Sequence, residues 1–396
     1  MIRAGVGCSK KESTADAARE AAILALSKDG VKAADFALVF ATPHHAKDYG
    51  AIAPLVAKTT GASHVAGCSA LGVLAGKEEI EIGPGIAVLA VRSDTISGYS
   101  FHFQDLAKRH SAAGHAIGQF VHDIGRGKGL LSLFPDPFSH QVSGLLSSVQ
   151  DDCPTPVPIV GGCASEDVNK QSTFQFSEKA TASGSVSGIY LTGDFDHTIG
   201  ISQACHPVSG PLIVTRSEGN RILELRGRPA LEQLTPLLKE PVEAGEPRTL
   251  AHIMIGFCVD PSDTELASGT YVVRNITGVD PTDGSIGTTD PIAEGQPLSF
   301  VVRDKKRARE EFQELAGNMA LSLAATPPRF GLYLNSVERG NALYHAMNVD
   351  SQILGNHFGD MPLIGFSTFG EIAPINGINT IHTYSGILVL ISDPPE

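Results

Sequence analysis

The sequence predicts a mixed α/β protein with two domains, and three observations support this prediction. A strand–helix–strand–strand order recurs along the chain, which indicates internal repetition. The length of 396 residues suits two domains better than one core. The composition, 42% hydrophobic and 18% charged, is typical of a folded protein. We therefore expect domains at residues 1–205 and 206–396, each built from repeated units whose sheets are covered by helices.

The first unit begins with an alternating strand over residues 1–8. Residues 13–27 are rich in alanine and leucine and predict a helix. Residues 36–41 are wholly apolar and predict a central strand, and residues 51–60 predict a second helix. A strand then enters the turn Gly67-Cys68-Ser69, and residues 85–91 form the closing strand.

The same order returns twice. The second copy comprises strand 129–134, helix 142–150, the turn Gly161-Gly162-Cys163 and strand 186–191. The third comprises strand 330–335, a helix within 342–358, the turn that begins at Gly365 and strand 386–391.

A different segment separates the second copy from the third. Residues 212–215 and 222–225 flank a Glu-Gly-Asn turn and predict a hairpin. The remaining expected elements are helix 229–239, strands 271–276 and 298–303, and helix 305–325.

The strand-end turns are the most informative feature. In the stretch from Gly365 to Glu371, an apolar strand ends in small and hydroxyl residues bracketed by glycines, and an acid follows. Glycine permits tight turns and close approach to the backbone. We expect freed N–H groups there to face one point together with Ser367, Thr368 and Glu371. This copy alone keeps both glycines and the acid, while Cys68 and Cys163 occupy matching places in the other two.

These residues carry a resemblance that covers essentially the whole chain. Its N-terminal markers are residues 5–9, 36–43, 67–69 and 161–164, and its C-terminal markers are residues 227–231, 339–340, 362–374, 379 and 382–384. With these motifs the chain resembles the FIST family, named for F-box and intracellular signal transduction proteins. It departs from the pattern at Val73, where a glutamate is usual, and before Arg339, where a cysteine or a run of small residues is commoner.

The resemblance implies a sensory module for intracellular signal transduction that binds small molecules such as amino acids. It also implies a separate signalling output protein as a partner, because the two halves use up the chain. We expect the ligand at the strand-end turns, where N–H groups and Arg339 would hold a carboxylate and Glu371 an ammonium group. The alternative is that the glycines only serve packing, that Glu371 caps a neighbouring element and that Arg339 pairs with Glu338 or Asp360. The candidate ligand-binding residues are Arg339, Gly340, Gly365, Phe366, Ser367, Thr368, Gly370, Glu371, Cys68, Ser69, Gly162 and Cys163.

Two other functions compete with ligand binding. A thiol-dependent hydrolase would use Cys68 with His44 or His45 as its base. Against this, the third copy has Phe366 and no cysteine, and free cysteine is often a small buried hydrophobe. A protein-interaction scaffold is the other alternative. We therefore leave the question of an enzyme open, leaning against one.

Charge and cysteine usage exclude several classes of protein. The net charge of −13 argues against nucleic acid as a partner. The six cysteines form no CxxC pair, and the histidine spacing fits no standard ligand set, so we expect no metal and no cofactor. No signal peptide and no membrane-spanning apolar stretch is evident, which favours a cytoplasmic protein without membrane insertion.

Overall fold

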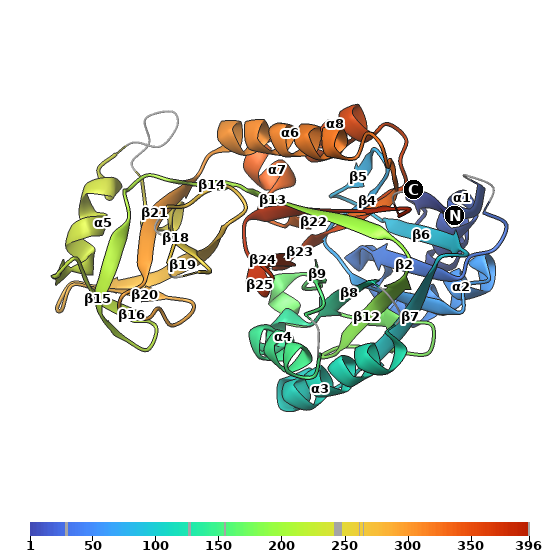
Figure 1. Cartoon of the computed structure of the whole chain (residues 1–396), viewed down its shortest axis with the longest axis horizontal. Coiled ribbons are helices and arrows are strands. Elements are labelled where there is room, and N and C mark those ends of the chain that lie inside the picture. Colours follow the sequence, from blue (N-terminus) through green and yellow to red (C-terminus); the bar gives the residue numbers. More distant parts are fainter. Residues whose placement is uncertain are drawn as a thin grey trace. The chain divides into compact units, whose positions relative to one another are not determined.

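The computed structural model describes residues 1–27, 31–125, 128–153, 156–240, 248–260, 262–263 and 265–394 (Figure 1). The chain forms two compact units. Unit 1 comprises Met1–Ile201, Phe312–Ile381 and Ser385–Glu396, and unit 2 comprises Ser202–Glu311 and His382–Tyr384. The predicted mixed α and β class is confirmed, with 30% helix and 40% strand. The boundary expected at residue 205 concerns the two halves of the sequence and stays a prediction.

Unit 1 contains the strand–helix–strand–strand order three times. Copy 1 comprises β1 (Ile2–Ser9), α1 (Thr14–Ser27), β2 (Phe36–Ala41), α2 (Tyr49–Thr60), β3 (His64–Ser69), β4 (Val73–Ala75), β5 (Glu78–Ile80) and β6 (Ile86–Ser93). Copy 2 comprises β7 (Ile96–Phe103), α3 (Leu106–Ile124), β8 (Lys128–Pro135), α4 (Val142–Asp151), β9 (Ile159–Gly162), β10 (Gln175–Ser177), β11 (Thr181–Ala182) and β12 (Val186–Gly193). Copy 3 comprises β13 (Asp196–Gln203), α6 (Lys305–Ser322), β22 (Pro328–Ser336), α7 (Gly340–Tyr344), α8 (Val349–Phe358), β23 (Leu363–Thr368), β24 (Glu371–Ile375), β25 (Ile378–His382) and β26 (Ser385–Ser392).

Each of the three copies contributes a hairpin to the sheet of another copy, and these contributions form a closed cycle, the hairpin ring. The sheets have the orders β1-β6-β2-β3-β10-β11, β7-β12-β8-β9-β24-β25 and β13-β26-β22-β23-β4-β5. Each copy therefore builds four strands of its own sheet, and the neighbouring copy completes that sheet with a short hairpin. Copy 2 completes the sheet of copy 1, copy 3 that of copy 2, and copy 1 that of copy 3.

One glycine in each copy makes this arrangement possible. Gly67, Gly161 and Gly365 occupy the same register position in β3, β9 and β23, and each faces the parallel neighbour strand. A Cβ atom on them would lie 1.7, 2.0 and 2.2 Å from the carbonyl oxygens of Val39, Leu133 and Tyr333, respectively. No other residue type fits at these positions, so the same packing requirement recurs in all three copies.

Helices cover the outer faces of the three sheets (Figure 1). Helices α1 and α2 pack on the first sheet, α3 and α4 on the second, and α6 and α8 on the third. The inner faces meet at three aromatic rings, because Phe40 lies 5.2 Å from Phe134 and 4.3 Å from Phe366 between ring centroids. The core of unit 1 is therefore shared by all three copies.

Helix α3 is not evident from the sequence because glycines interrupt it. Gly114 and Gly118 have a packing role, since a Cβ atom there would lie 2.5 Å from Ser148 Cβ and 2.7 Å from the Val149 carbonyl oxygen in α4. Small residues let two helix backbones approach closely, so the glycines that weaken the helix signal also fix the helix pair.

Unit 2 is a separate β-sheet of the order β14-β21-β15-β16-β20-β19-β18. The sheet closes on itself because β21 pairs with β18 as well as with β15, and α5 packs against its core. Its elements are β14 (Cys205–Pro207), β15 (Leu212–Glu218), β16 (Arg221–Leu225), β17 (Arg228–Pro229), α5 (Ala230–Leu238), β18 (Ile253–Cys258), β19 (Tyr271–Asp280), β20 (Ser285–Thr288) and β21 (Pro297–Arg303). Among the described residues of both units, no helix has the length and apolarity needed to cross a membrane.

Candidate functional site

The three strand-end turns of unit 1 converge. Ser165 N donates a hydrogen bond of 3.1 Å to the Ser69 carbonyl, and Ser165 Oγ donates to the carbonyl of Ser367. Ser367 N in turn donates 2.9 Å to the Gly72 carbonyl, which closes the circuit back to copy 1. We call Ser69, Ser165, Ser367 and Thr368 the turn cluster. The sequence left open whether the turns lie together or apart, and these hydrogen bonds bring all three together.

The backbone N–H groups of these turns are not free, contrary to the expectation of an anion-binding nest. Cys163 N donates to the carbonyl of Gly370 at 2.8 Å, and Phe369 N donates to that of Cys163 at 3.2 Å. Gly370 N donates to Thr368 Oγ1 at 3.3 Å. The hairpin exchange explains part of this result, since Cys163 N and Phe369 N bind between neighbouring copies, whereas Gly370 N binds within its own turn.

Glu371 lies at the centre of this arrangement and is fully buried. Its carboxylate accepts hydrogen bonds from Thr368 Oγ1 at 2.6 Å, from Ser385 Oγ at 2.6 Å and from Ser385 N at 3.1 Å. Burial raises the pKa of Glu371 to about 7, although the hydrogen bonds from Ser385 and Thr368 oppose the shift. The carboxyl group therefore changes charge near neutral pH.

The other copies carry different side chains at the position of Glu371. In register, Glu371 pairs with Gly162, Gln175 with Cys68, and Val73 with Phe366. Gln175 is also buried and bonds a serine and a threonine. Its amide oxygen accepts from Ser185 Oγ at 2.8 Å, as Glu371 accepts from Ser385, whereas its NH2 donates to Thr173 at 2.9 Å. The acid is thus specific to the third hairpin.

A second polar group lies beside the turn cluster. Arg339 is buried, and its guanidinium donates to Asp350 at 3.2 and 3.4 Å and to Tyr344 OH at 2.8 Å. Tyr333 OH donates to the same carboxylate at 2.7 Å. The guanidinium also lies 5.4 Å from the ring centroid of Phe312. We call Arg339, Asp350, Tyr333 and Tyr344 the arginine cluster; its buried acid is Asp350, which the sequence did not single out.

A narrow cavity of about 10 Å³ separates the two clusters, lined by residues that include Glu79, Asn335 and Ser367. Glu79 belongs to the hairpin strand β5, and its buried Oε2 atom has no hydrogen-bond partner among the described residues. Burial raises the pKa of Glu79 to about 8, and the neighbouring carboxylates of Asp350 and Glu81 add to the shift. Such a cavity holds about one water molecule.

The thiols are poorly suited to catalysis. Cys68 and Cys163 are both buried, and burial raises the pKa of each thiol. They do not occupy matching places, because Cys68 corresponds in register to Gly162 and Phe366. His45 is directed to Thr14 at 3.1 Å, and His44 is exposed. This geometry opposes a Cys–His pair.

The structure brings most of the predicted site residues together. Gly162 packs against the turn cluster, because a Cβ atom on it would lie 2.6 Å from Thr368 Cγ2. Gly340 adjoins the arginine cluster, and Asn341 N next to it donates to Glu81 at 2.9 Å. Sequence reasoning missed Glu79 and Asp350. The run of acids around Glu79 and the acid in the first turn of α8 were the available signals.

The site therefore defines an α/β protein of three copies around a buried group of ionisable side chains. Models of known families match nearly the whole chain, the FIST N domain over residues 35–228 and the FIST C domain over residues 230–374. The chain belongs to the FIST family. FIST domains are associated with the sensory binding of small ligands in signalling.

The relatives extend over the full length. An uncharacterised protein of Mycobacterium tuberculosis is 27% identical over 392 residues, which cover 99% of this chain and all of that protein. One of Mycobacterium bovis is 27% identical over 396 residues and covers both chains fully. A solved cyanuric acid hydrolase aligns over 99% of this chain and 100% of its own with a TM-score of 0.37 and 8% identity. The hydrolase from A. caulinodans covers 48% of this chain and 71% of its own with a TM-score of 0.28 and 9% identity. At this level, the structural similarity carries no inference.

Proposed function

We propose that this chain is a sensory protein for intracellular signal transduction that binds an amino acid or a related amine-bearing metabolite between the turn cluster and the arginine cluster. The observation that carries the proposal is an excess of buried acids over buried cations. Glu371 and Asp350 are buried and Glu79 is partly buried in the cavity wall, whereas Arg339 is the one buried cation that the described residues place with them. A separate signalling protein as the output partner belongs to the same proposal.

The charges around the site favour a ligand that carries an amine group. Arg339 is already bound to Asp350, so it offers little compensation to Glu79 or Glu371. Burial raises the pKa values of Glu79 and Glu371 to about 8 and about 7, respectively, which fits carboxylates that Arg339 compensates only in part. A ligand ammonium would supply that charge and would also satisfy Glu79 Oε2. The carboxylate of an amino acid would then share the guanidinium of Arg339.

Ligand entry requires the β4–β5 hairpin to shift, because the cavity holds about one water molecule. The outer contacts of this hairpin include the exposed ion pair of Glu78 with Lys10 at 2.7 Å. Lys77 pairs with Asp360 at 2.8 Å in an exposed ion pair, and Glu81 accepts from Asn341 N at 2.9 Å. Exposed ion pairs of this type contribute roughly 0–1 kcal/mol, so the hairpin is weakly held on this side.

The test is saturable thermal stabilisation by amino acids and related metabolites, each compared with the matched hydroxy acid that lacks the amine. A ligand at 100 times its Kd stabilises a protein by about 2.7 kcal/mol. We expect the amino acid alone to stabilise, and more strongly at pH 8.5 than at pH 6. The pH effect arises because protonated Glu79 and Glu371 do not attract an ammonium group.

Two substitutions on one hairpin locate the site. Glu79→Gln should abolish the stabilisation, because it removes the charge but keeps the shape. Glu78→Gln is the matched control, since Glu78 is exposed and pairs with Lys10 at 2.7 Å. Full stabilisation of the Glu79→Gln protein, or none of the wild type by any amine, would exclude the proposal.

A further inference from the structure

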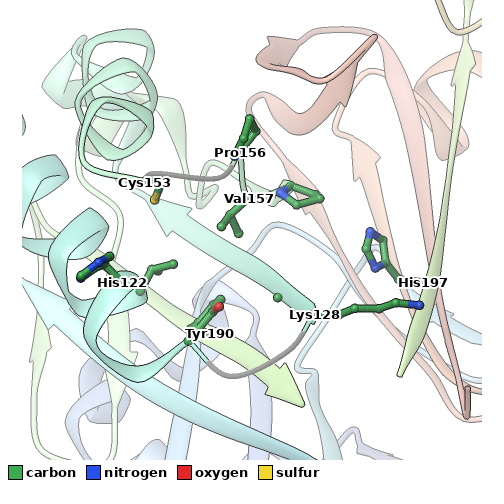
Figure 2. Close-up of a pocket in the computed structure, with 11 residues that line it drawn as sticks. His122, Lys128, Cys153, Pro156, Val157, Tyr190 and His197 are labelled. Carbon is green, nitrogen blue, oxygen red and sulfur yellow. The ribbon is translucent and has the colours of Figure 1, made fainter. Parts of the chain in front are cut away.

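A second and larger cavity lies at the other end of the copy 2 sheet. It has a volume of about 420 Å³ and is formed by the end of α3, the beginning of β8 and β9, and residues of β12 and β13 (Figure 2). The turn cluster follows the opposite ends of β8 and β9. This cavity is therefore separate from the proposed amine site, and its volume lies within the usual range for small-molecule pockets.

The described lining is unusual for so acidic a chain. It contains three nitrogen bases, His122, Lys128 and His197, together with the Tyr190 phenol and the Cys153 thiol, but no carboxylate. The chain as a whole carries a net charge of −13. A pocket that lacks acids in such a chain favours an anionic group over a cationic one.

The polar groups lie on opposite walls, with Lys128 and His197 on one side and His122 and Cys153 on the other (Figure 2). His197 Nδ1 is buried and has no hydrogen-bond partner among the described residues. Burial and the nearby Lys128 lower the pKa of His197, so its ring is neutral at pH 7 and one ring nitrogen can donate to a ligand. A ligand acceptor placed against this nitrogen would satisfy its hydrogen-bonding capacity.

The charged neighbours leave room for a ligand carboxylate. Lys128 pairs with Asp196 and stays half-exposed, so its remaining N–H groups can reach the pocket. His122 is directed to Asp123 at 3.3 Å, and both side chains are exposed. The other walls are apolar and include Val121 and Val157. We propose that this pocket binds a small organic acid, with its carboxylate at Lys128 and His197 and its apolar or aromatic body against the valine and proline walls.

Cys153 provides a direct readout. It is partly exposed and lies in the wall of the pocket, whereas Cys8 is partly exposed and lies in β1 of copy 1. The probe is 1-naphthoate, and the uncharged control is 1-naphthamide. The whole chain is alkylated with iodoacetamide at pH 8.5, and the two cysteines are followed separately by mass spectrometry.

We expect saturating naphthoate to slow the alkylation of Cys153 at least tenfold and to leave Cys8 unchanged, with naphthamide clearly weaker. Lys128→Met should raise the half-protecting concentration about tenfold, whereas Lys179→Met, an exposed lysine remote from the cavity lining, should not. Equal protection by acid and amide, protection of both cysteines, or none at millimolar naphthoate would overturn the proposal. These outcomes are independent of the proposed amine site, which is tested separately by the Glu79→Gln variant.

Discussion

At the residue scale, the three copies show how one position acquires a function. Glu371, Gln175 and Val73 occupy equivalent places in the three hairpins. Gln175 accepts the same serine hydrogen bond as Glu371 and bonds a threonine in the reverse direction, without carrying a charge. A neutral side chain therefore suffices for this packing in copy 2, and the charge of Glu371 in copy 3 requires another explanation, which the proposed ligand binding would supply.

Glu371→Gln should make the third hairpin resemble the second, and the effect should depend on pH. In the folded state the pKa of Glu371 is raised to about 7 from its ordinary value of 4.5. The wild-type residue is thus most favourable below pH 4.5, and this contribution falls as the pH rises through 7. We expect the variant to be close to wild type in stability at pH 5 and more stable by about 2 kcal/mol at pH 8. Urea unfolding at both pH values measures this; an equal difference at the two pH values contradicts it.

The recurring glycines make a second prediction at this scale. Gly365→Ala would place a Cβ atom 2.2 Å from the Tyr333 carbonyl oxygen, so two parallel strands would have to separate. We expect a loss of roughly 3 kcal/mol in unfolding free energy. Gly50→Ala in α2 is the control, because nothing lies within 4 Å of its Cβ position, and it should stabilise by roughly 0.5–1 kcal/mol. Similar unfolding curves for the two variants would show that the close approach is not what requires glycine.

At the element scale, a buried ion pair fastens α7 and α8 to the third sheet. Arg339 directly precedes α7, Asp350 lies in the first turn of α8, and Tyr333 comes from β22. Asp350→Asn would leave the buried guanidinium without its counter-charge, which typically costs about 3–5 kcal/mol. Asp360→Asn is the matched change in an exposed pair and should cost roughly 0.5 kcal/mol or less. Thermal unfolding of both variants decides this, and a small effect of Asp350→Asn would show that the cluster is dispensable.

The elements themselves follow well from the sequence, and their pairing does not. The apolar run at residues 36–41 is β2, as predicted. The exchange of hairpins joins residues nearly 300 positions apart, such as Val73 and Phe366, and no local pattern encodes such a contact. Gln175 was missed because a longer turn separates it from Gly161 than separates Glu371 from Gly365. The sequence drew attention to the turns, but it assigned their N–H groups to a ligand because no local pattern shows that residues of a neighbouring copy bind several of them.

At the scale of the whole molecule, three copies form unit 1, and one long segment, Ser202–Glu311, forms unit 2 together with His382–Tyr384. All three sheets of unit 1 are complete without residues 204–310. The two ends of that segment lie close together, since Gln203 N donates to Glu311 Oε1 at 2.8 Å. The residues of α6 that pack in the core of the third sheet include Phe312 and Ala316. They follow residue 310, so the deletion of residues 204–310 keeps them.

Replacing residues 204–310 with a short Gly-Ser linker should therefore yield a folded protein. We expect a single cooperative thermal transition, because the hairpin ring joins all three copies into one core. The amine-dependent stabilisation should persist, since Glu79, Glu371 and Arg339 all belong to unit 1. Circular dichroism and size exclusion report the fold, and the ligand series is repeated on the shortened chain. An unfolded product would show that unit 1 depends on unit 2, whereas a folded product that has lost the ligand response would assign unit 2 a part in binding.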